Sequence, residues 1–177
     1  MRQMIKKRII IVGKGGSGKD HMRKELQKTG YRYCVSHTSR PKRNGESDGV
    51  DYYFVDSEYF QKNLNRFYES VVFNGWFYGT SIEEFKRANL LIMTPSGISK
   101  LNPEDRQESL VVYIDIPEDI RRERLSERGD ADSVERRLSA DRDDFSKFSD
   151  YDVSVEDPFF KCDFDWIDKL TPKKIII

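Results

Sequence analysis

The chain has 177 residues, and its 31 lysines and arginines balance 31 aspartates and glutamates, so its formal net charge is zero. A balanced charge argues against general nucleic-acid binding, which usually needs a basic surface. No apolar stretch reaches the roughly 18–20 residues that a membrane span requires. The cysteines, Cys34 and Cys162, provide neither a disulfide framework nor metal-ligand spacing. These features predict a soluble, cytoplasmic protein of one domain, with no nucleic-acid or membrane partner.

The first third of the chain reads as strand, glycine-rich turn and helix, followed by weaker signals. A continuous apolar run predicts a buried parallel strand at 8–12. The polar segment 19–28 predicts a helix, because a glycine follows its last turn. Alternating aromatic and polar residues favour a strand at 31–37, and a second strand is expected at 52–55. Asp56 and Ser57 can cap a helix that runs to about Arg66.

The remainder alternates in the same way. The dipeptide Asn74-Gly75 predicts a hairpin between strands at 67–73 and 76–78, and Ser81 begins a capping box for a short helix. The later apolar runs predict strands at 90–93, 110–116 and 153–155. The later polar segments predict helices at 117–129, 132–148 and 164–170. Strands that alternate with helices predict an α/β fold with a parallel sheet, into which the hairpin region is inserted.

A phosphate-binding loop follows the first strand and opens the first helix. It matches G-x-x-x-x-G-K and consists of Gly13, Lys14, Gly15, Gly16, Ser17, Gly18, Lys19 and Asp20. Glycines permit positive φ, so that consecutive N–H groups can surround a polyphosphate, and the helix N-terminus favours the anion. Lys19 would face the β- and γ-phosphates, and Asp20 replaces the usual magnesium-binding Ser or Thr.

The segments after this loop resemble the guanylate kinase family. Residues 35–46 read VSHTSRPKRNGE and residues 48–55 read DGVDYYFV, which is similar to the family's GMP-binding stretch. Residues 73–80, FNGWFYGT, resemble its second signature, and residues 124–129 and 136–140 resemble its arginine-bearing lid. These motifs occur in the family's order and cover nearly the whole chain.

The resemblance implies a three-layer P-loop kinase fold with a parallel core sheet, a small mixed-β GMP-binding insert and a helical lid. The single domain 1–177 would then divide into a core at 1–35, 85–125 and 145–177, an insert at 36–84 and a lid at about 126–144.

The resemblance also implies which residues bind GMP: Ser36, Arg40, Arg43, Tyr52, Glu69, Tyr78, Gly79 and Thr80. Two guanidinium groups can hold a phosphate dianion, and two phenol hydroxyls can orient it. The Glu69 carboxylate suits the N1–H and amino group of guanine, whereas it would repel the bare N1 of adenine. An exposed strand glutamate and ordinary tyrosines at the edge of a core are the alternatives for these positions.

The family's catalytic positions correspond to Lys19, Arg40, Arg124, Arg128 and Arg137. Phosphoryl transfer depends mostly on positioning and positive charge, so no protein nucleophile or general base is needed. A helix surface with ordinary ion pairs is the alternative for the lid arginines, since glutamates are interleaved with them.

Three departures from the family pattern limit what the resemblance implies for this chain. The stretch after 90–93 has Thr94 where the family usually has Asp-x-Asp, the lid is about two residues shorter, and Glu156 replaces a late Asn. We hypothesise that the metal-side carboxylate has moved to the phosphate loop as Asp20. The rival interpretation is that the Asp at position 20 and the missing Asp-x-Asp both weaken the use of magnesium.

The expected activity is transfer of the ATP γ-phosphoryl group to GMP or dGMP, with Mg²⁺, by a monomer or homodimer. The alternatives are a kinase for another (deoxy)nucleoside monophosphate and a non-catalytic guanylate-kinase-like binding module. The intact Gly13, Gly18 and Lys19 favour an enzyme over the module.

Overall fold

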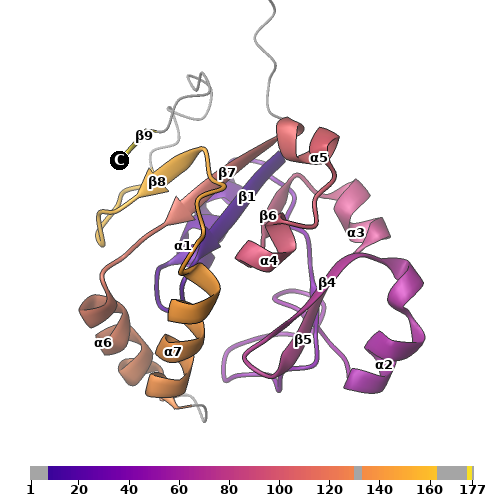
Figure 1. Ribbon diagram of the computed structural model, residues 1–177, viewed down its shortest axis with the longest axis horizontal. Coiled ribbons are helices and arrows are strands. Elements are labelled where there is room, and N and C mark those ends of the chain that lie inside the picture. Colours follow the sequence, from indigo (N-terminus) through magenta and orange to yellow (C-terminus); the bar gives the residue numbers. More distant parts are fainter. Residues whose placement is uncertain (1–7, 130–132, 163–174, 177) are drawn as a thin grey trace, which may run out of the picture.

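The computed structural model describes residues 8–129, 133–162 and 175–176, which form two sheets and their covering helices (Figure 1). The larger sheet is parallel and has the strand order β6-β1-β7-β8-β9. Its strands are β1 (Arg8–Gly13), β6 (Leu90–Ile92), β7 (Ser109–Ile114), β8 (Val153–Val155) and β9 (Ile175–Ile176). The predicted α/β class with a parallel sheet is therefore confirmed.

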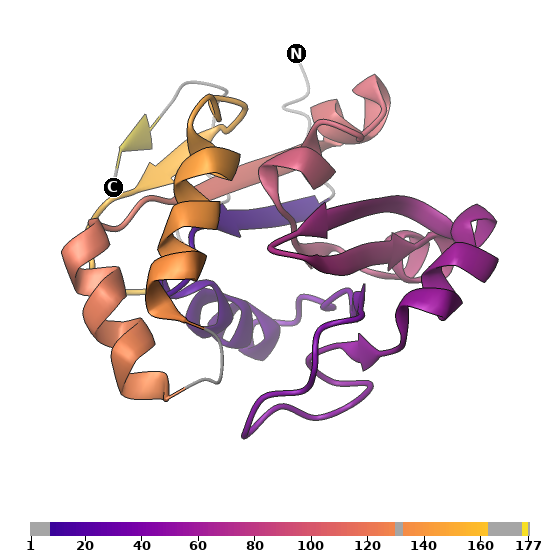
Figure 2. The same cartoon turned by 60° about the horizontal axis from the view of Figure 1, so that its bottom comes forward.

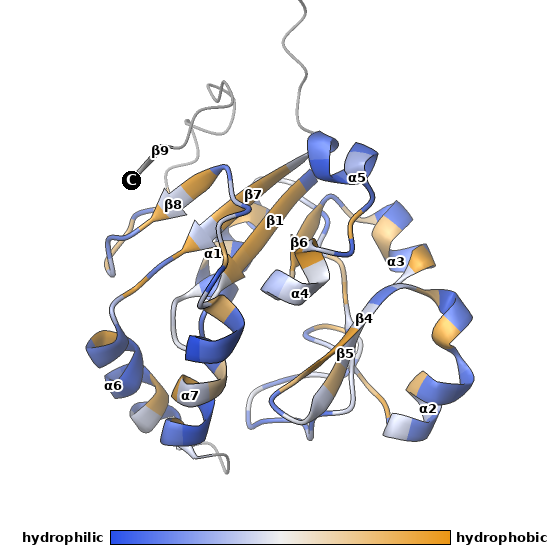
Figure 3. Cartoon of the chain, viewed as in Figure 1, coloured by the Kyte–Doolittle hydropathy of each residue, from blue (hydrophilic) through white to orange (hydrophobic). Residues whose placement is uncertain are grey.

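The central strands are buried on both faces, which explains their continuous apolar runs. Ile9 and Ile11 of β1 face one layer, where they pack with Met22 and Leu26 of helix α1 (Lys19–Lys28). The alternate residues of β1 face the other layer, which contains Phe85 of α3 (Ile82–Arg87). Helices α4 (Pro95–Ile98) and α7 (Val134–Phe145) lie on this second face, and the apolar strands contrast with the more polar outer helices (Figure 3).

The smaller sheet is mixed and has the order β3-β2-β5-β4. Strands β2 (His37–Thr38) and β3 (Tyr53–Phe54) are parallel, whereas β4 (Phe67–Phe73) and β5 (Trp76–Ser81) form the predicted hairpin. At the turn, Asn74 has φ 50° and Gly75 has φ 80°, as in the tight hairpin turns that favour Asn-Gly. Figure 2 shows this sheet, in magenta and purple, on the opposite side of the molecule from the orange helix α7.

Several predicted elements are shorter or different. The strand expected at 31–37 is reduced to a bridge between Tyr33 and Leu90, followed by β2. The N–H of Cys34 donates to the carbonyl oxygen of Leu90 at 2.8 Å, and the next N–H, that of Val35, donates to the Glu84 carboxylate of α3 at 3.0 Å. The helix expected at 57–66 divides into α2 (Ser57–Lys62) and a 3₁₀ turn (Leu64–Arg66).

The remaining helices follow their capping residues. Helix α6 (Glu118–Arg128) begins after Pro117 and ends at Gly129, whose φ is 60°. Helix α5 (Pro103–Glu108) and helix α4 were not predicted, although Asn102 and Thr94 cap them and a proline follows each cap. The helix expected at 132–148 is shorter, and the one expected at 164–170 lies outside the described residues. Within the described part of the chain, no helix is long and apolar enough to cross a membrane.

Candidate active site

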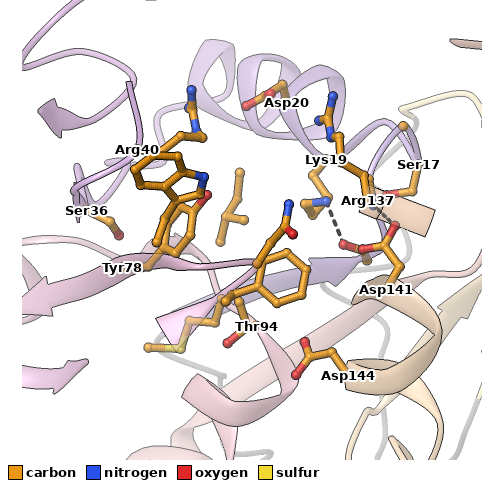
Figure 4. Close-up of a pocket in the computed structure, with 18 of the residues that line it drawn as sticks. Ser17, Lys19, Asp20, Ser36, Arg40, Tyr78, Thr94, Arg137, Asp141 and Asp144 are labelled. Carbon is orange, nitrogen blue, oxygen red and sulfur yellow. Dashed lines mark hydrogen bonds between the residues drawn. The ribbon is translucent and has the colours of Figure 1, made fainter. Parts of the chain in front are cut away.

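A cavity of about 270 Å³ opens at the carboxyl ends of β1 and β6, between the two sheets and helix α7. This is the edge of a parallel sheet at which ligands of α/β proteins bind. Ser17, Lys19, Arg137 and Asp141 lie at one end of it, and Ser36, Arg40 and Tyr78 lie at the other (Figure 4). The fold therefore brings together side chains that are far apart in sequence.

The phosphate loop has the backbone that its glycines predict. Gly16 and Gly18 have φ of 76° and 102°, and a Cβ at Gly13 would approach the carbonyl oxygen of Ile114 to 2.8 Å. The side chain of Lys14 points away from the cavity and pairs with Asp115 at 3.0 Å. The loop thus presents its backbone and three side chains, those of Ser17, Lys19 and Asp20, to the cavity.

Lys19 and Ser17 are both suited to an anion. The Lys19 ammonium donates to the carbonyl oxygens of Gly13 at 2.6 Å and Lys14 at 3.0 Å. Burial, opposed by Asp141, lowers the pKa of Lys19 to about 8. The hydroxyl of Ser17 is buried and has no hydrogen-bond partner in the described structure. A bound phosphate would supply the acceptor and the negative charge that these groups lack.

The lid arginines have three different surroundings. Arg137 is buried and lines the cavity, and Arg128 is exposed at its rim. Arg124 lies outside the cavity lining, since its guanidinium donates to the carbonyl oxygens of Gly16 at 3.1 Å and Pro158 at 2.6 Å. In this structure Arg124 supports the phosphate loop from behind, and its predicted contact with ATP would require this arrangement to change.

The other end of the cavity is organised around Arg40. Its guanidinium donates to Glu46 and to the carbonyl oxygen of Pro41, each at 2.7 Å, and lies 5.4 Å from the ring centre of Tyr52. Glu46 also accepts from the N–H of Arg43 at 2.7 Å, so it fixes the loop that carries both arginines. The loop residues predicted to bind a monophosphate therefore converge on one side of the cavity.

Glu69 reaches the cavity from β4 and is only 8% exposed. The register of β4 and β5 shifts between Phe67 and Glu69, and such a bulge re-aims the side chain that follows it. Burial raises the pKa of Glu69, and hydrogen bonds from Thr80 oppose that rise. The alternative of an exposed strand glutamate is therefore wrong for Glu69.

The remaining predicted residues fall into two groups. Tyr52 and Tyr78 line the cavity half-buried, with ring centres 6.1 Å apart. Thr80 is buried and lies outside the cavity lining, where it contacts Glu69. Gly79 has a packing reason to be glycine, because a Cβ there would come within 2.8 Å of the Phe67 ring.

The residues suited to a magnesium ion are carboxylates at the phosphate end. Asp20 lines the cavity, but its side chain is 61% exposed and lies 3.5 Å from Nε of Arg23. Asp144 of α7 also lines the cavity, and its Oδ2 is buried with no hydrogen-bond partner. No group of three or more His, Cys, Asp or Glu residues within the described ranges could hold a metal alone. Carboxylates of this kind do fit a Mg²⁺ ion that arrives with phosphates.

The model of one family, described as guanylate kinase, matches residues 5–161. The chain belongs to the guanylate kinase family. The guanylate kinase of Legionella pneumophila (strain Paris) is 36% identical over 167 residues, which cover 86% of this chain and 79% of that protein. The guanylate kinase of Sus scrofa is 30% identical, covering 77% of this chain and 75% of that protein.

Two other matches are narrower in what they support. The guanylate kinase of Schizosaccharomyces pombe is 44% identical, but the match covers 43% of this chain and 40% of that protein. A crystal structure of guanylate kinase from Anaplasma phagocytophilum covers 94% of this chain and 83% of its own, with a TM-score of 0.67 at 22% identity. That likeness supports the guanylate kinase fold, including the separate mixed sheet.

Sequence reasoning missed several residues of this guanylate kinase site. These are Glu46, Trp76, Arg121, Asp141 and Asp144. Asp141 and Asp144 are three residues apart and so share a face of α7, which the helix prediction could have revealed. For Trp76 the signal was its place directly after the Asn-Gly turn.

Proposed function

We propose that this protein transfers the γ-phosphoryl group of ATP to GMP or dGMP, giving ADP and GDP or dGDP. The observation that carries the proposal is the single cavity that has Lys19 of the phosphate loop at one end and Arg40 and Glu69 at the other. Phosphoryl transfer needs two anionic substrates held in line within one water-excluding site, and this arrangement meets that need.

Each end of the cavity has its own task in this reaction. Lys19 and the loop N–H groups hold the ATP phosphates, and Arg137 from α7 neutralises charge on the transferring group. Arg40 and Arg43 hold the acceptor phosphate, with Tyr52 and Tyr78 orienting it, and an oxygen of that phosphate attacks the γ-phosphorus as ADP departs. The attacking oxygen is already ionised at neutral pH, so no residue has to remove a proton.

Mg²⁺ is part of the proposal. Bound with ATP, it would neutralise charge between the β- and γ-phosphates. Asp20 and Asp144 are the residues of the cavity whose carboxylates suit it. Replacing Asp20 by Ser tests the first of them, since an unchanged rate and an unchanged magnesium dependence would refute a metal role for Asp20.

The base preference follows from Glu69. Its buried carboxylate accepts two hydrogen bonds from the N1–H and amino group of guanine, whereas adenine offers an acceptor at N1. A cytoplasmic location and a monomeric or homodimeric state remain predictions from the sequence.

The test is release of ADP in a coupled assay with ATP and Mg²⁺, with GMP, dGMP, AMP, CMP, UMP and dTMP offered separately. Turnover with GMP and dGMP alone is expected. Turnover with another base would keep the kinase and overturn the base assignment. Binding of GMP without turnover would instead support a binding module.

A further inference from the structure

The end of β6 supplies no carboxylate to the cavity, and Thr94 cannot substitute for one. Its hydroxyl accepts from the N–H of Gly97 at 3.1 Å and so caps helix α4. The wall of the cavity at the end of β6 is therefore neutral on the strand side, and any carboxylate there has to come from another element.

Four carboxylates line the cavity, and three of them already have partners: Asp20, Glu69 and Asp141. Asp20 lies beside Arg23, Glu69 is bonded to Thr80, and Asp141 accepts from the N–H of Gly15 at 2.9 Å and from Arg121 at 3.1 Å. The fourth, Asp144, has a buried Oδ2 for which the described structure provides no donor. Figure 4 shows its carboxylate directed from α7 into the cavity, on the side where β6 ends at Thr94.

Nothing in the folding of α7 requires a carboxylate at this position. Asp144 lies in the last turn of the helix, where the macrodipole disfavours negative charge. A buried carboxylate without a donor or cation also costs free energy. Burial, followed by the charge of Asp141, raises the pKa of Asp144 to about 6. The structure thus places a carboxylate for which the described residues supply no donor in the same cavity as the loop proposed to receive the phosphates of ATP.

We propose that Asp144 faces the Mg²⁺ ion that ATP carries and helps to hold it at the phosphate loop, in place of the carboxylate that the end of β6 lacks. The proposal rests on the proposed function, since ATP brings the ion. Mg²⁺ in such sites is bound by one or two carboxylates together with substrate phosphates and water. Lid helix α7 would then contribute Arg137 toward the phosphates and Asp144 toward the metal from one face.

The test is calorimetric titration of a non-hydrolysable ATP analogue, with excess Mg²⁺ and with EDTA. The ratio of the two dissociation constants measures how strongly the metal is coupled to nucleotide binding. Asp144→Asn is expected to reduce this ratio about tenfold, as loss of a residue that orients a metal typically does. Asp143→Asn is the matched control, since Asp143 is the exposed neighbour on the same helix and lies outside the cavity lining.

Two further variants complete the test. Asp144→Glu keeps the carboxylate and should retain most of the coupling, which separates a metal role from a packing role. Asp20→Asn is measured beside it, and a loss of coupling in Asp20→Asn together with full coupling in Asp144→Asn would assign the metal to the phosphate loop instead. Full coupling in Asp144→Asn overturns the proposal, whatever the Asp20 variant does.

Folding and function are controlled separately. Without Mg²⁺, Asp144→Asn should unfold at the same or a higher temperature than the parent, because it removes an unpaired buried charge. If the parent protein binds the analogue neither with Mg²⁺ nor with EDTA, the proposed function fails and the Asp144 proposal with it. If the analogue binds and the coupling survives Asp144→Asn, only the Asp144 proposal fails.

Discussion

Lys19 shows how burial prepares a single residue for its ligand. Its ammonium is held by two backbone carbonyl oxygens, and burial is the main cause that lowers its pKa to about 8. Because this value is below that of an unfolded lysine, the folded protein loses the proton first as the pH rises. Stability without nucleotide therefore increases between about pH 8 and pH 10.5, the ordinary pKa of a lysine.

Binding of an ATP analogue should reverse this effect. The phosphates favour the charged ammonium, so binding at pH 8 is expected to take up about half a proton at Lys19. Calorimetry at pH 8 in buffers of different ionisation enthalpy measures the uptake. Lys19→Met supplies the control, in which this share of the uptake should disappear. Equal uptake in the parent and in Lys19→Met would contradict the assignment.

A second prediction for a single residue concerns Glu69, which is proposed to select guanine over adenine. Replacing it by Gln, which has the same shape, presents a donor to a guanine donor and should lower kcat/KM for GMP about 30- to 100-fold. The ratio of GMP to AMP turnover should fall by a similar factor, while the affinity for the ATP analogue should not change. Steady-state kinetics with both monophosphates measures this. A loss of ATP affinity equal to the loss for GMP would point to a folding defect instead.

At the scale of elements, one buried ion pair joins α6 and α7 to the phosphate loop. Arg121 is 2% exposed and donates to Asp141 at 3.1 Å and to the carbonyl oxygen of Gly15 at 3.2 Å. Asp141 accepts in addition from the N–H of Gly15. The phosphate loop, α6 and α7 are thus connected through the side chains of Arg121 and Asp141.

Removing one partner of this pair should destabilise the fold strongly. Asp141→Ala leaves a buried guanidinium without its carboxylate, and a loss of about 3–5 kcal/mol in the free energy of unfolding is expected. Urea denaturation measures it, with exposed Asp143→Ala as the control expected within about 0.5 kcal/mol of the parent. The double variant Arg121→Met, Asp141→Leu should lose less than the sum of the two single variants. Additive losses would show that the pair is not coupled.

At the scale of the whole molecule, helix α7 contacts the β4–β5 turn of the small sheet. The guanidinium of Arg136 on α7 donates to the carbonyl oxygen of Asn74 at 3.1 Å, at the turn between β4 and β5. A Cβ at Gly75 would lie 3.1 Å from the same guanidinium, so the glycine permits the approach. A contact at the rim of the cavity is expected to limit the access of water to phosphates bound there.

Loss of the contact should therefore affect water exclusion more than stability. Arg136→Ala is expected to raise the ratio of ATP hydrolysis to phosphoryl transfer several-fold and to lower kcat/KM for GMP about fivefold, which corresponds to one hydrogen bond. Hydrolysis of ATP with and without GMP measures the ratio, and the melting temperature should stay unchanged. Lys62→Ala on α2, which removes an exposed ion pair with Glu58, should leave the ratio as it is. Equal ratios in both variants would contradict a covering role.

Local patterns of the chain are enough to predict the parallel sheet, the phosphate loop and many of the residues that line the cavity. Continuous apolar runs predict strands buried on both faces, and the glycine spacing before α1 requires a particular backbone, because these are local properties of the chain. The motif around Arg40 and Arg43 likewise predicted a loop that converges on the cavity. Helices α4 and α5 also have local signals, since a proline follows each of their caps, Thr94 and Asn102, although neither helix was predicted.

The contacts between the sheet, the phosphate loop and the helices, in contrast, are visible only in the folded chain. The segment 31–36 has the composition of a strand, but its pairing with β6 is an isolated bridge at Tyr33, and the N–H of Val35 donates to a carboxylate of α3. Arg124 turns to the back of the phosphate loop, and Oδ2 of Asp144 is buried with no hydrogen-bond partner among the described residues. Which donor reaches which acceptor depends on contacts between residues distant in the sequence, and no local pattern encodes such contacts.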